Sequence, residues 1–435
     1  GNPQEMGYLG SSLEREARQM KQAYERQTAT DSSSSSFPRI VIHSATCNHG
    51  QTHDGIAAGG TRLAQEVNQL LDTLRNDSND NGNRSSNDDN DGQTLPSVSL
   101  SWVGNSLGGL YARYALSQIP ALHPNDSNNI QDESGNGSTC SSLSSSWLRP
   151  AIFCTTATPH LGVGHQHTYV PLPRFAECIV AGVLQTTGQD LFQCRSTVDS
   201  STTTTTTIIQ EMTTQPQFVQ PLQRYERRRA HANAVGDFQV PTATAAFLNA
   251  QSDSPHHLVD VVADLGRGAC FDNNDNAAAA WQQFGRLAVT TPQQTTNTNN
   301  DNDNDTNSDY CNATQLAERL DALGWTKFFW DVRATLPRVP VPVPRLLFGG
   351  ATLSANKKKQ YTSAELHREF SSLLTSNSDS SNSEWHLPFG HTMLVANSKT
   401  DWYASLNSGG RPIMDWVARD LLHHIVWDDD VDKEE

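Results

Sequence analysis

The sequence predicts an α/β protein in which helices flank a mostly parallel sheet. Two observations support this fold class. Short apolar segments rich in β-branched and aromatic residues alternate with segments whose apolar residues repeat at helical spacing. In addition, an apolar run at residues 98–103 ends at Gly104 and passes through a short polar turn into a helical run at residues 110–116. Short apolar strands of this kind are typical of parallel sheets that are covered on both faces.

The predicted strands all lie in the first part of the chain. Each is a short run of apolar residues that ends at a Gly, a Pro or a polar cluster. This is the pattern of a buried strand. They cover residues 37–43, 98–103, 150–157 and 230–235. The last of these strands is followed by the turn pair Gly236-Asp237.

The predicted helices lie between and after these strands. In residues 60–74, for example, Leu63, Val67 and Leu70 fall on one face. Further helical segments cover residues 110–116, 175–191, 218–225, 313–323 and 411–425, and residues 13–20 are polar but helix-prone. Residues 325–350 are rich in Pro and aromatic residues, so we expect them to be irregular or to form a lid.

Polar tracts interrupt this alternation. They consist mainly of Asn, Asp, Ser, Thr and Gly and cannot bury apolar surface, so we expect disordered surface insertions. They lie near residues 76–94, 121–146, 197–214, 292–309 and 375–384. The other segments predict one domain at residues 37–427, with a polar N-terminal segment and linker at 1–36 and an acidic tail at 428–435.

Composition excludes some classes of partner. The net charge of −16 argues against nucleic acid as a partner. The 7 cysteines are scattered and odd in number, which is typical of free thiols in a reducing compartment. No run of residues is long and apolar enough to span a bilayer, so we expect a cytoplasmic protein and leave peripheral membrane contact open. The chain begins at Gly1, so an upstream targeting signal also stays open.

The turn at Ser106 has the pattern of a catalytic serine. Gly104-x-Ser106-x-Gly108 lies between a strand and a helix, which is the context of the nucleophile elbow of α/β-hydrolases. In that elbow the serine occupies a strained turn, and small residues two positions before and after it let the backbone close tightly. The alternative is a Gly-rich turn with a solvated serine, and the flanking strand and helix favour the catalytic interpretation.

Several blocks of sequence resemble a known family. They are residues 39–45 with the helix start at 59–63, residues 104–114, residues 157–162 and residues 225–241. The most distinctive is Ala232-Asn233-x-x-Gly236-Asp237-x-x-Val240-Pro241. Together they resemble the putative serine esterase family of lipase-like α/β-hydrolases, which includes the Rog-type lipases. The resemblance covers about half the chain and implies an α/β-hydrolase fold.

The resemblance implies a Ser-His-Asp triad. It makes Ser106 the nucleophile, Asp237 the acid and a histidine near the C-terminus the base, in the chain order of α/β-hydrolases. The expected oxyanion donors are the backbone N–H groups of Leu107 and Ala45. Two positions depart from the family pattern, because Ser44 follows His43 where a Gly is common and Asn105 precedes Ser106 where a His is common.

The choice of acid and base leaves alternatives. Asp253, Asp260 and Asp264 compete with Asp237, but none directly follows such an apolar strand. We place the base at His391, because it follows the turn sequence Pro388-Phe389-Gly390 and a loop lets an imidazole reach over the sheet edge. His386 is the main alternative. The other histidines after Asp237 are less suited by position, namely His256, His257, His367, His423 and His424.

These residues predict hydrolysis of a carboxylic ester, with a lipid acyl ester or small ester as substrate on family grounds. The reaction needs no metal and no organic cofactor. His49-x-x-x-His53 and His165-x-His167 lack a carboxylate or Cys partner at a persuasive spacing, so we interpret them as loop histidines. The alternatives are an acyltransferase or thioesterase with the same triad, and a non-catalytic scaffold of hydrolase fold.

Overall fold

The computed structural model describes most of the chain outside the polar tracts. The described residues are 3–28, 37–82, 98–123, 147–164, 181–193, 197–198, 205–235, 237, 239–261, 276–294, 312–336, 338–339, 359–375, 385–386 and 389–427. Residues 124–146, 295–311 and 428–435 lie outside them, as does most of each insertion expected near 76–94 and 375–384.

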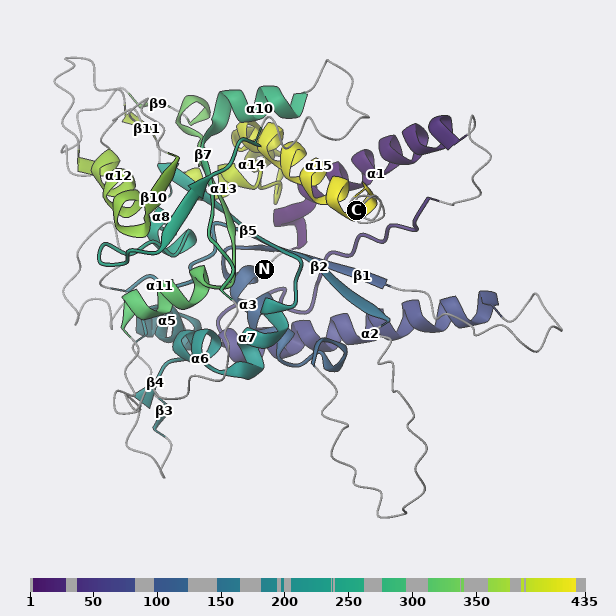
Figure 1. Ribbon diagram of the computed structural model, residues 1–435, viewed down its shortest axis with the longest axis horizontal. Helices are drawn as coiled ribbons and strands as arrows, with labels where there is room; N and C mark the ends of the chain where they lie inside the picture. The colour runs from purple at the N-terminus through teal and green to yellow at the C-terminus, as the bar shows by residue number, and fades with distance from the viewer. Residues whose placement is uncertain are drawn as a thin grey trace, which may run out of the picture.

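A seven-stranded sheet forms the centre of the molecule (Figure 1). Its strands follow the order β1 (Val98–Asn105), β2 (Leu148–Thr156), β5 (Arg227–Val235), β8 (Thr326–Asp331), β7 (Gly285–Thr290), β6 (Pro255–Leu258) and β10 (Gln360–Thr362). The first four strands are parallel, whereas each pair from β8 to β10 is antiparallel. The protein is therefore a mixed α/β structure, and its parallel half contains the strands that the sequence predicts at 98–103, 150–157 and 230–235.

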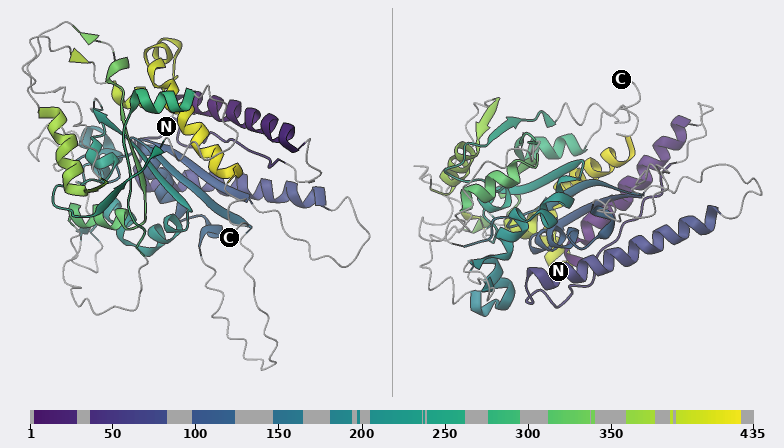
Figure 2. Two further views of the ribbon diagram at one scale, coloured as in Figure 1. Left: turned by 45° about the horizontal axis from the view of Figure 1, so that its top comes forward. Right: turned by 60° about the horizontal axis from the view of Figure 1, so that its bottom comes forward.

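Helices cover both faces of this sheet (Figure 2). On one face lie α1 (Gly7–Thr28), α10 (Asn276–Phe284) and α15 (Arg411–Trp427), whose apolar residues pack with Cys154 and Trp330 of the sheet. On the other face lie α2 (Ile56–Gly82), α3 (Leu107–Leu116), α7 (Pro216–Gln223) and α11 (Ala313–Asp321), which pack with Trp102 and Phe153. Because successive side chains of a strand point to opposite faces, neighbours such as Phe153 and Cys154 serve different cores.

The remaining elements are short or lie at the ends of the sheet. The helices are α5 (Gln185–Leu191), α6 (Ile208–Thr214), α8 (Thr242–Ala245), α12 (Ser363–Thr375), α13 (Gly390–Leu394) and α14 (Asp401–Leu406). Two small sheets pair β3 (Thr197–Val198) with β4 (Thr205–Thr206) and β9 (Arg338–Val339) with β11 (Trp385–His386). Within the described part of the chain, no helix is long and apolar enough to cross a membrane.

The structure adds detail to the expected domain. The polar N-terminal segment contains α1, whose Leu9 is buried in the core beside α15. Helix α2 continues to Gly82, into the insertion expected from residue 76. The insertion expected at 197–214 contains α6, whose Thr207 and Gln210 form a capping box and whose Ile209 is buried. Composition alone does not predict this helix, because its few apolar residues lie within a Thr-rich stretch.

Two expected elements also differ. Residues 37–43, which we expected to form a strand, lie in a described segment that has no regular secondary structure. Conversely, the segment at 325–350, expected to be irregular or lid-like, begins with the buried central strand β8. The aromatic residues of β8 are core residues, and the Pro-rich pattern that misled the prediction starts only after Leu336.

Candidate active site

Ser106 occupies a strained turn between β1 and α3. Its backbone has φ 52° and ψ −126°, a conformation that is rare for residues other than Gly. Such a residue costs of order 1–3 kcal/mol and persists only when its surroundings fix it. Here the Ser106 N–H donates to the Thr156 carbonyl (2.8 Å), and the Ser106 carbonyl accepts from the Gly109 N–H (3.1 Å). The turn thus presents Ser106 at the carboxyl end of β1.

Two glycines make this turn possible, but they are not the expected pair. A Cβ on Gly104 would lie 2.5 Å from the Gly109 Cα, and one on Gly109 would lie 2.1 Å from Thr158 Oγ1. At Gly108, a Cβ would meet no heavy atom of the described chain within 4 Å. The expectation that a small residue is needed two positions after Ser106 is therefore wrong, and the close contact is made one residue later.

Asp237 follows β5 and is held by several donors. The pairing of β5 with β8 shifts register between Asn233 and Val235, and a bulge of this kind re-aims the residues that follow it. Asp237 is 1% exposed. Its Oδ1 accepts from the N–H groups of Gln239 (3.0 Å) and Val240 (2.9 Å), and its Oδ2 accepts from Asn233 Nδ2 (3.0 Å). The carboxylate is therefore fixed in one orientation.

His391 lies directly against this carboxylate. It is the second residue of α13, and the residue before that helix, Phe389, forms a β-bridge with Asp237. His391 Nδ1 lies 3.0 Å from Asp237 Oδ2. A carboxylate only accepts, so Nδ1 carries the hydrogen and donates a hydrogen bond to it. The ring is 6% exposed. The structure thus brings together two residues that are 154 positions apart in the sequence.

The pKa of His391 is raised above its ordinary value. Burial by itself lowers this pKa because it disfavours the charged ring. The charge and hydrogen bond of Asp237 outweigh burial, and the charge of Glu5 adds to them. Glu5 belongs to the short 3-10 helix Pro3–Met6 that precedes α1, and nothing in the polar N-terminal sequence indicates its place near His391.

Ser106 and Asp237 share one edge of the sheet. They follow β1 and β5, which run parallel and are separated only by β2, and the carboxyl ends of parallel strands meet at the same edge. Within the described chain, Asp237 and His391 are hydrogen-bonded to each other, but no hydrogen bond joins Ser106 Oγ to His391. Contacts to a catalytic serine are often long in a protein without substrate and tighten in the complex.

The two expected oxyanion donors, the N–H groups of Leu107 and Ala45, lie in different local structures. Leu107 is the first residue of α3, whose N-terminus has no side-chain cap, so its N–H groups are not occupied by a capping side chain. Ala45 is half-buried in a segment without regular structure and packs on the same core as Leu107. The next two N–H groups, of Thr46 and Cys47, both donate to Glu66.

Other histidines have structural partners. His43 contacts Glu66 (2.8 Å), and buried His160 contacts Arg113 (3.4 Å) and Thr155 (3.0 Å). Burial and nearby cations lower the pKa of His160 far below its ordinary value. The backbone of His386, in β11, pairs with that of Arg338, in β9. The described residues include no group of His, Cys, Asp or Glu that could hold a metal ion, and His165, His167 and Asp264 lie outside them.

Comparisons with known proteins identify the family of this chain. Residues 6–252, more than half of the chain, match the model of the family described as "Putative serine esterase". The chain belongs to this family. It is 26% identical to "Putative lipase ROG1" of Saccharomyces cerevisiae over 217 residues, 48% of this chain. It is also 26% identical to "Putative lipase C4A8.10" of Schizosaccharomyces pombe over 226 residues, 52% of this chain.

Each match spans 24% of the relative's own length. No solved structure matches the chain. The family match ends at residue 252, so it includes Ser106 and Asp237 but not His391.

Proposed function

We propose that this protein is a serine hydrolase of α/β-hydrolase fold that cleaves carboxylic esters. The observation that carries the proposal is the hydrogen bond between His391 and Asp237 at the sheet edge where Ser106 occupies its strained turn. A buried carboxylate on Nδ1 leaves Nε2 of the same ring as the base, which is the relationship that a serine nucleophile requires. Family membership supports the same reaction class.

The proposed reaction passes through an acyl-enzyme. Ser106 Oγ attacks the ester carbonyl while His391 takes its proton, and Asp237 stabilises the imidazolium that forms. The N–H groups of Leu107 and Ala45 stabilise the tetrahedral oxyanion. His391 then gives its proton to the leaving alcohol, and water releases the acid from Ser106 by the same steps in reverse.

We further propose a lipid acyl ester as the substrate class. The relatives of known name are described as lipases, although each is matched over a minor share of its length. A series of p-nitrophenyl esters of increasing chain length tests this substrate class. Rising kcat/KM with chain length supports it, whereas a maximum at acetate would restrict the proposal to short esters.

Labelling with a fluorophosphonate probe tests the serine mechanism directly. Wild-type protein should be labelled, Ser106→Ala should not, and its esterase turnover should fall by about a million-fold, as for loss of the nucleophile in a characterised serine protease. Ser99→Ala, an exposed position on the same strand, is the matched control and should label normally. Esterase activity in Ser106→Ala near the wild-type level would overturn the proposal. Adding a competing alcohol then separates transfer to an acceptor from hydrolysis.

A further inference from the structure

One buried side chain contacts both the acid and the loop that carries the base. Asn233 is the seventh residue of β5 and is 1% exposed. Its Nδ2 donates to Asp237 Oδ2 (3.0 Å) and to the Gly390 carbonyl (3.0 Å). Gly390 directly precedes His391, so one amide group bridges the two segments whose side chains form the acid–base pair.

The orientation of this amide is fixed by its partners. Both contacts are to oxygen atoms that only accept, so the NH₂ group must face them and the carbonyl Oδ1 must point away. There, Asn233 Oδ1 is buried and has no hydrogen-bond partner in the described structure. A buried acceptor without a partner costs about 1–3 kcal/mol. The two hydrogen bonds that Nδ2 donates to buried acceptors offset this cost, so the amide serves the Asp237 carboxylate and the Gly390 carbonyl.

The backbone around Asn233 is also anchored. Thr242 Oγ1, at the start of α8, donates to the Asn233 carbonyl (2.6 Å). The register shift with β8 begins after this residue, so β5 is irregular between Asn233 and its end at Val235, before the chain turns towards Asp237. The backbone of Asn233 is therefore held in place, and its side chain can position the loops that carry Asp237 and His391.

We propose that Asn233 is a positioning residue that holds the Asp237 carboxylate and the His391 loop at their working distance and orientation. The proposal rests on the function proposed above and assigns Asn233 no contact with substrate. Its two hydrogen bonds satisfy one lone pair of the acid and one carbonyl of the base-bearing loop. Without them, the Asp237–His391 contact relies on the backbone donors of Gln239 and Val240 and on the Phe389 bridge.

Two variants test this role: one removes both donors of Asn233, and the other replaces its amide with a carboxyl group. Asn233→Leu keeps the branched shape of the side chain and removes both donors. We expect kcat to fall about 100-fold, which is the cost of a 1 Å misplacement, with KM nearly unchanged. The melting temperature should also fall, because two buried acceptors lose their donor. Asn233→Asp keeps the shape and adds a carboxylate beside Asp237.

The charged groups that act on His391 are Asp237, on the loop after β5, and Glu5, before α1. Two buried carboxyl groups in contact cannot both ionise, so in Asn233→Asp a proton is shared with Asp237 and the negative charge that acts on His391 is weakened. The pKa of His391 should then fall, and the acid limb of the kcat/KM profile should move to lower pH. A residue that only supports the fold would change stability without moving this limb.

Asn249→Asp is the matched control. Asn249 is also buried, but its Oδ1 accepts from Thr314 and Gln251, and it does not contact the acid or the base. It should keep the wild-type pH profile. If Asn233→Leu retains wild-type kcat while Ser106→Ala is inactive, the positioning role is wrong and the proposed function stands. If Asn233→Leu does not fold, an unshifted acid limb in Asn233→Asp overturns the role. An active Ser106→Ala instead overturns the function itself.

Discussion

Two carboxylates from distant parts of the chain act on His391. Asp237 binds its Nδ1 directly, and Glu5 raises its pKa through charge. Sequence reasoning could select Asp237 and His391, because each occupies a turn next to an apolar run and their order matches α/β-hydrolases. It could not find Glu5, because an acidic residue in a polar N-terminal segment carries no local signal. Asn233 was named only as part of a family block, because its role depends on a contact across 157 positions.

The influence of Glu5 can be measured through the pH profile. Glu5→Gln removes a negative charge that favours the protonated ring, so the pKa of His391 should fall. Because the neutral ring is the proposed base, the acid limb of kcat/KM should move to lower pH, by less than about one unit. Glu14→Gln, at an exposed position of α1, is the control. A shift to higher pH would contradict the placement of Glu5.

The identity of the base can be tested with two histidine variants. His391→Ala should lose several orders of magnitude in turnover of a short activated ester, with an unchanged circular dichroism spectrum. His386→Ala should retain activity within about tenfold, because the base role of His391 is intact. The reverse pattern would move the base to His386, and two active variants would show that neither histidine is the base.

At the scale of elements, the parallel half of the sheet was more predictable than the antiparallel half. Strand β2 is buried along nearly its whole length and β5 from Arg228 onward, and β1, β2 and β5 each contain an apolar run by which local sequence identifies them. Strand β6 contains Pro255, His256 and His257, and its pairing with β7 and β10 rather than its composition makes it a strand. The helix α15, expected at 411–425, ends within two residues of the expected boundary.

The turn that presents Ser106 predicts different effects for substitutions at Gly108 and at Gly109. In Gly109→Ala the new methyl group would collide with Thr158, which lies on the loop after β2. The elbow or this loop must then move, so we expect activity to fall about 100-fold and stability to fall by about 1–3 kcal/mol. Gly108→Ala meets open space and should remain within a few-fold of wild-type activity. Equal losses in the two variants, by ester assay and urea unfolding, would contradict this packing.

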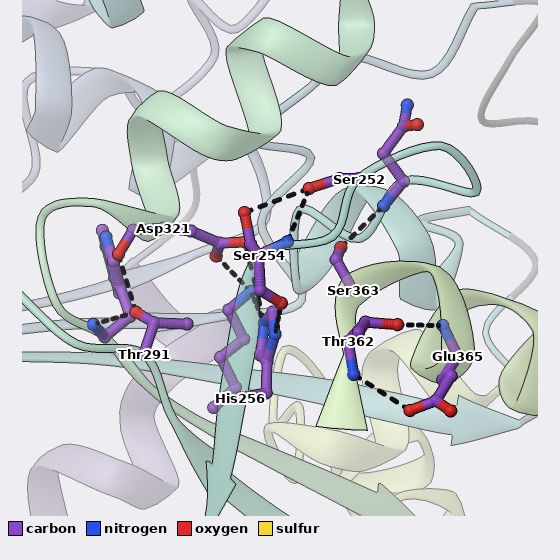
Figure 3. Close-up of polar contacts among 11 residues, drawn as sticks. Ser252, Ser254, His256, Thr291, Asp321, Thr362, Ser363 and Glu365 are labelled. Carbon is purple, nitrogen blue, oxygen red and sulfur yellow. Dashed lines mark hydrogen bonds and ion pairs between the residues drawn. The ribbon is translucent and has the colours of Figure 1, made fainter. Parts of the chain in front are cut away.

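At the scale of the whole molecule, two groups of buried polar residues lie towards opposite ends of the parallel strands. The carboxyl ends of β1 and β5 carry the proposed site. Lys327, near the start of β8, lies towards the other end of the parallel half, is fully buried, and donates to Asp321 Oδ1 (2.5 Å) and His256 Nε2 (2.8 Å). Figure 3 shows Asp321 and His256 converging beside Ser254, at the junction of β6 with the end of α11. This cluster joins elements of the antiparallel half to the central strand.

Burial controls the charges of this cluster. It raises the pKa of Asp321 to about 6 and lowers the pKa of Lys327, while burial and the charge of Lys327 lower the pKa of His256 to about 2. His256 is therefore neutral at physiological pH, and its Nδ1 donates to the Ser254 carbonyl. Lys327 is the cation that compensates Asp321, because His256 carries no charge.

Removing Lys327 should therefore expose the cost of a buried, uncompensated carboxylate. Lys327→Met should lower the free energy of unfolding at pH 7 by about 3–5 kcal/mol, and adding Asp321→Asn should recover much of the loss. Since the pKa of Asp321 in the folded protein is above its unfolded value, ionisation costs stability as the pH rises through about 6. The deficit of Lys327→Met should therefore be smaller at pH 5 than at pH 7. Urea unfolding at both pH values measures it, with exposed Lys359→Met as a control that changes stability by less than about 0.5 kcal/mol. A deficit that is equal at both pH values would show that lost packing, rather than the charge of Asp321, destabilises the variant.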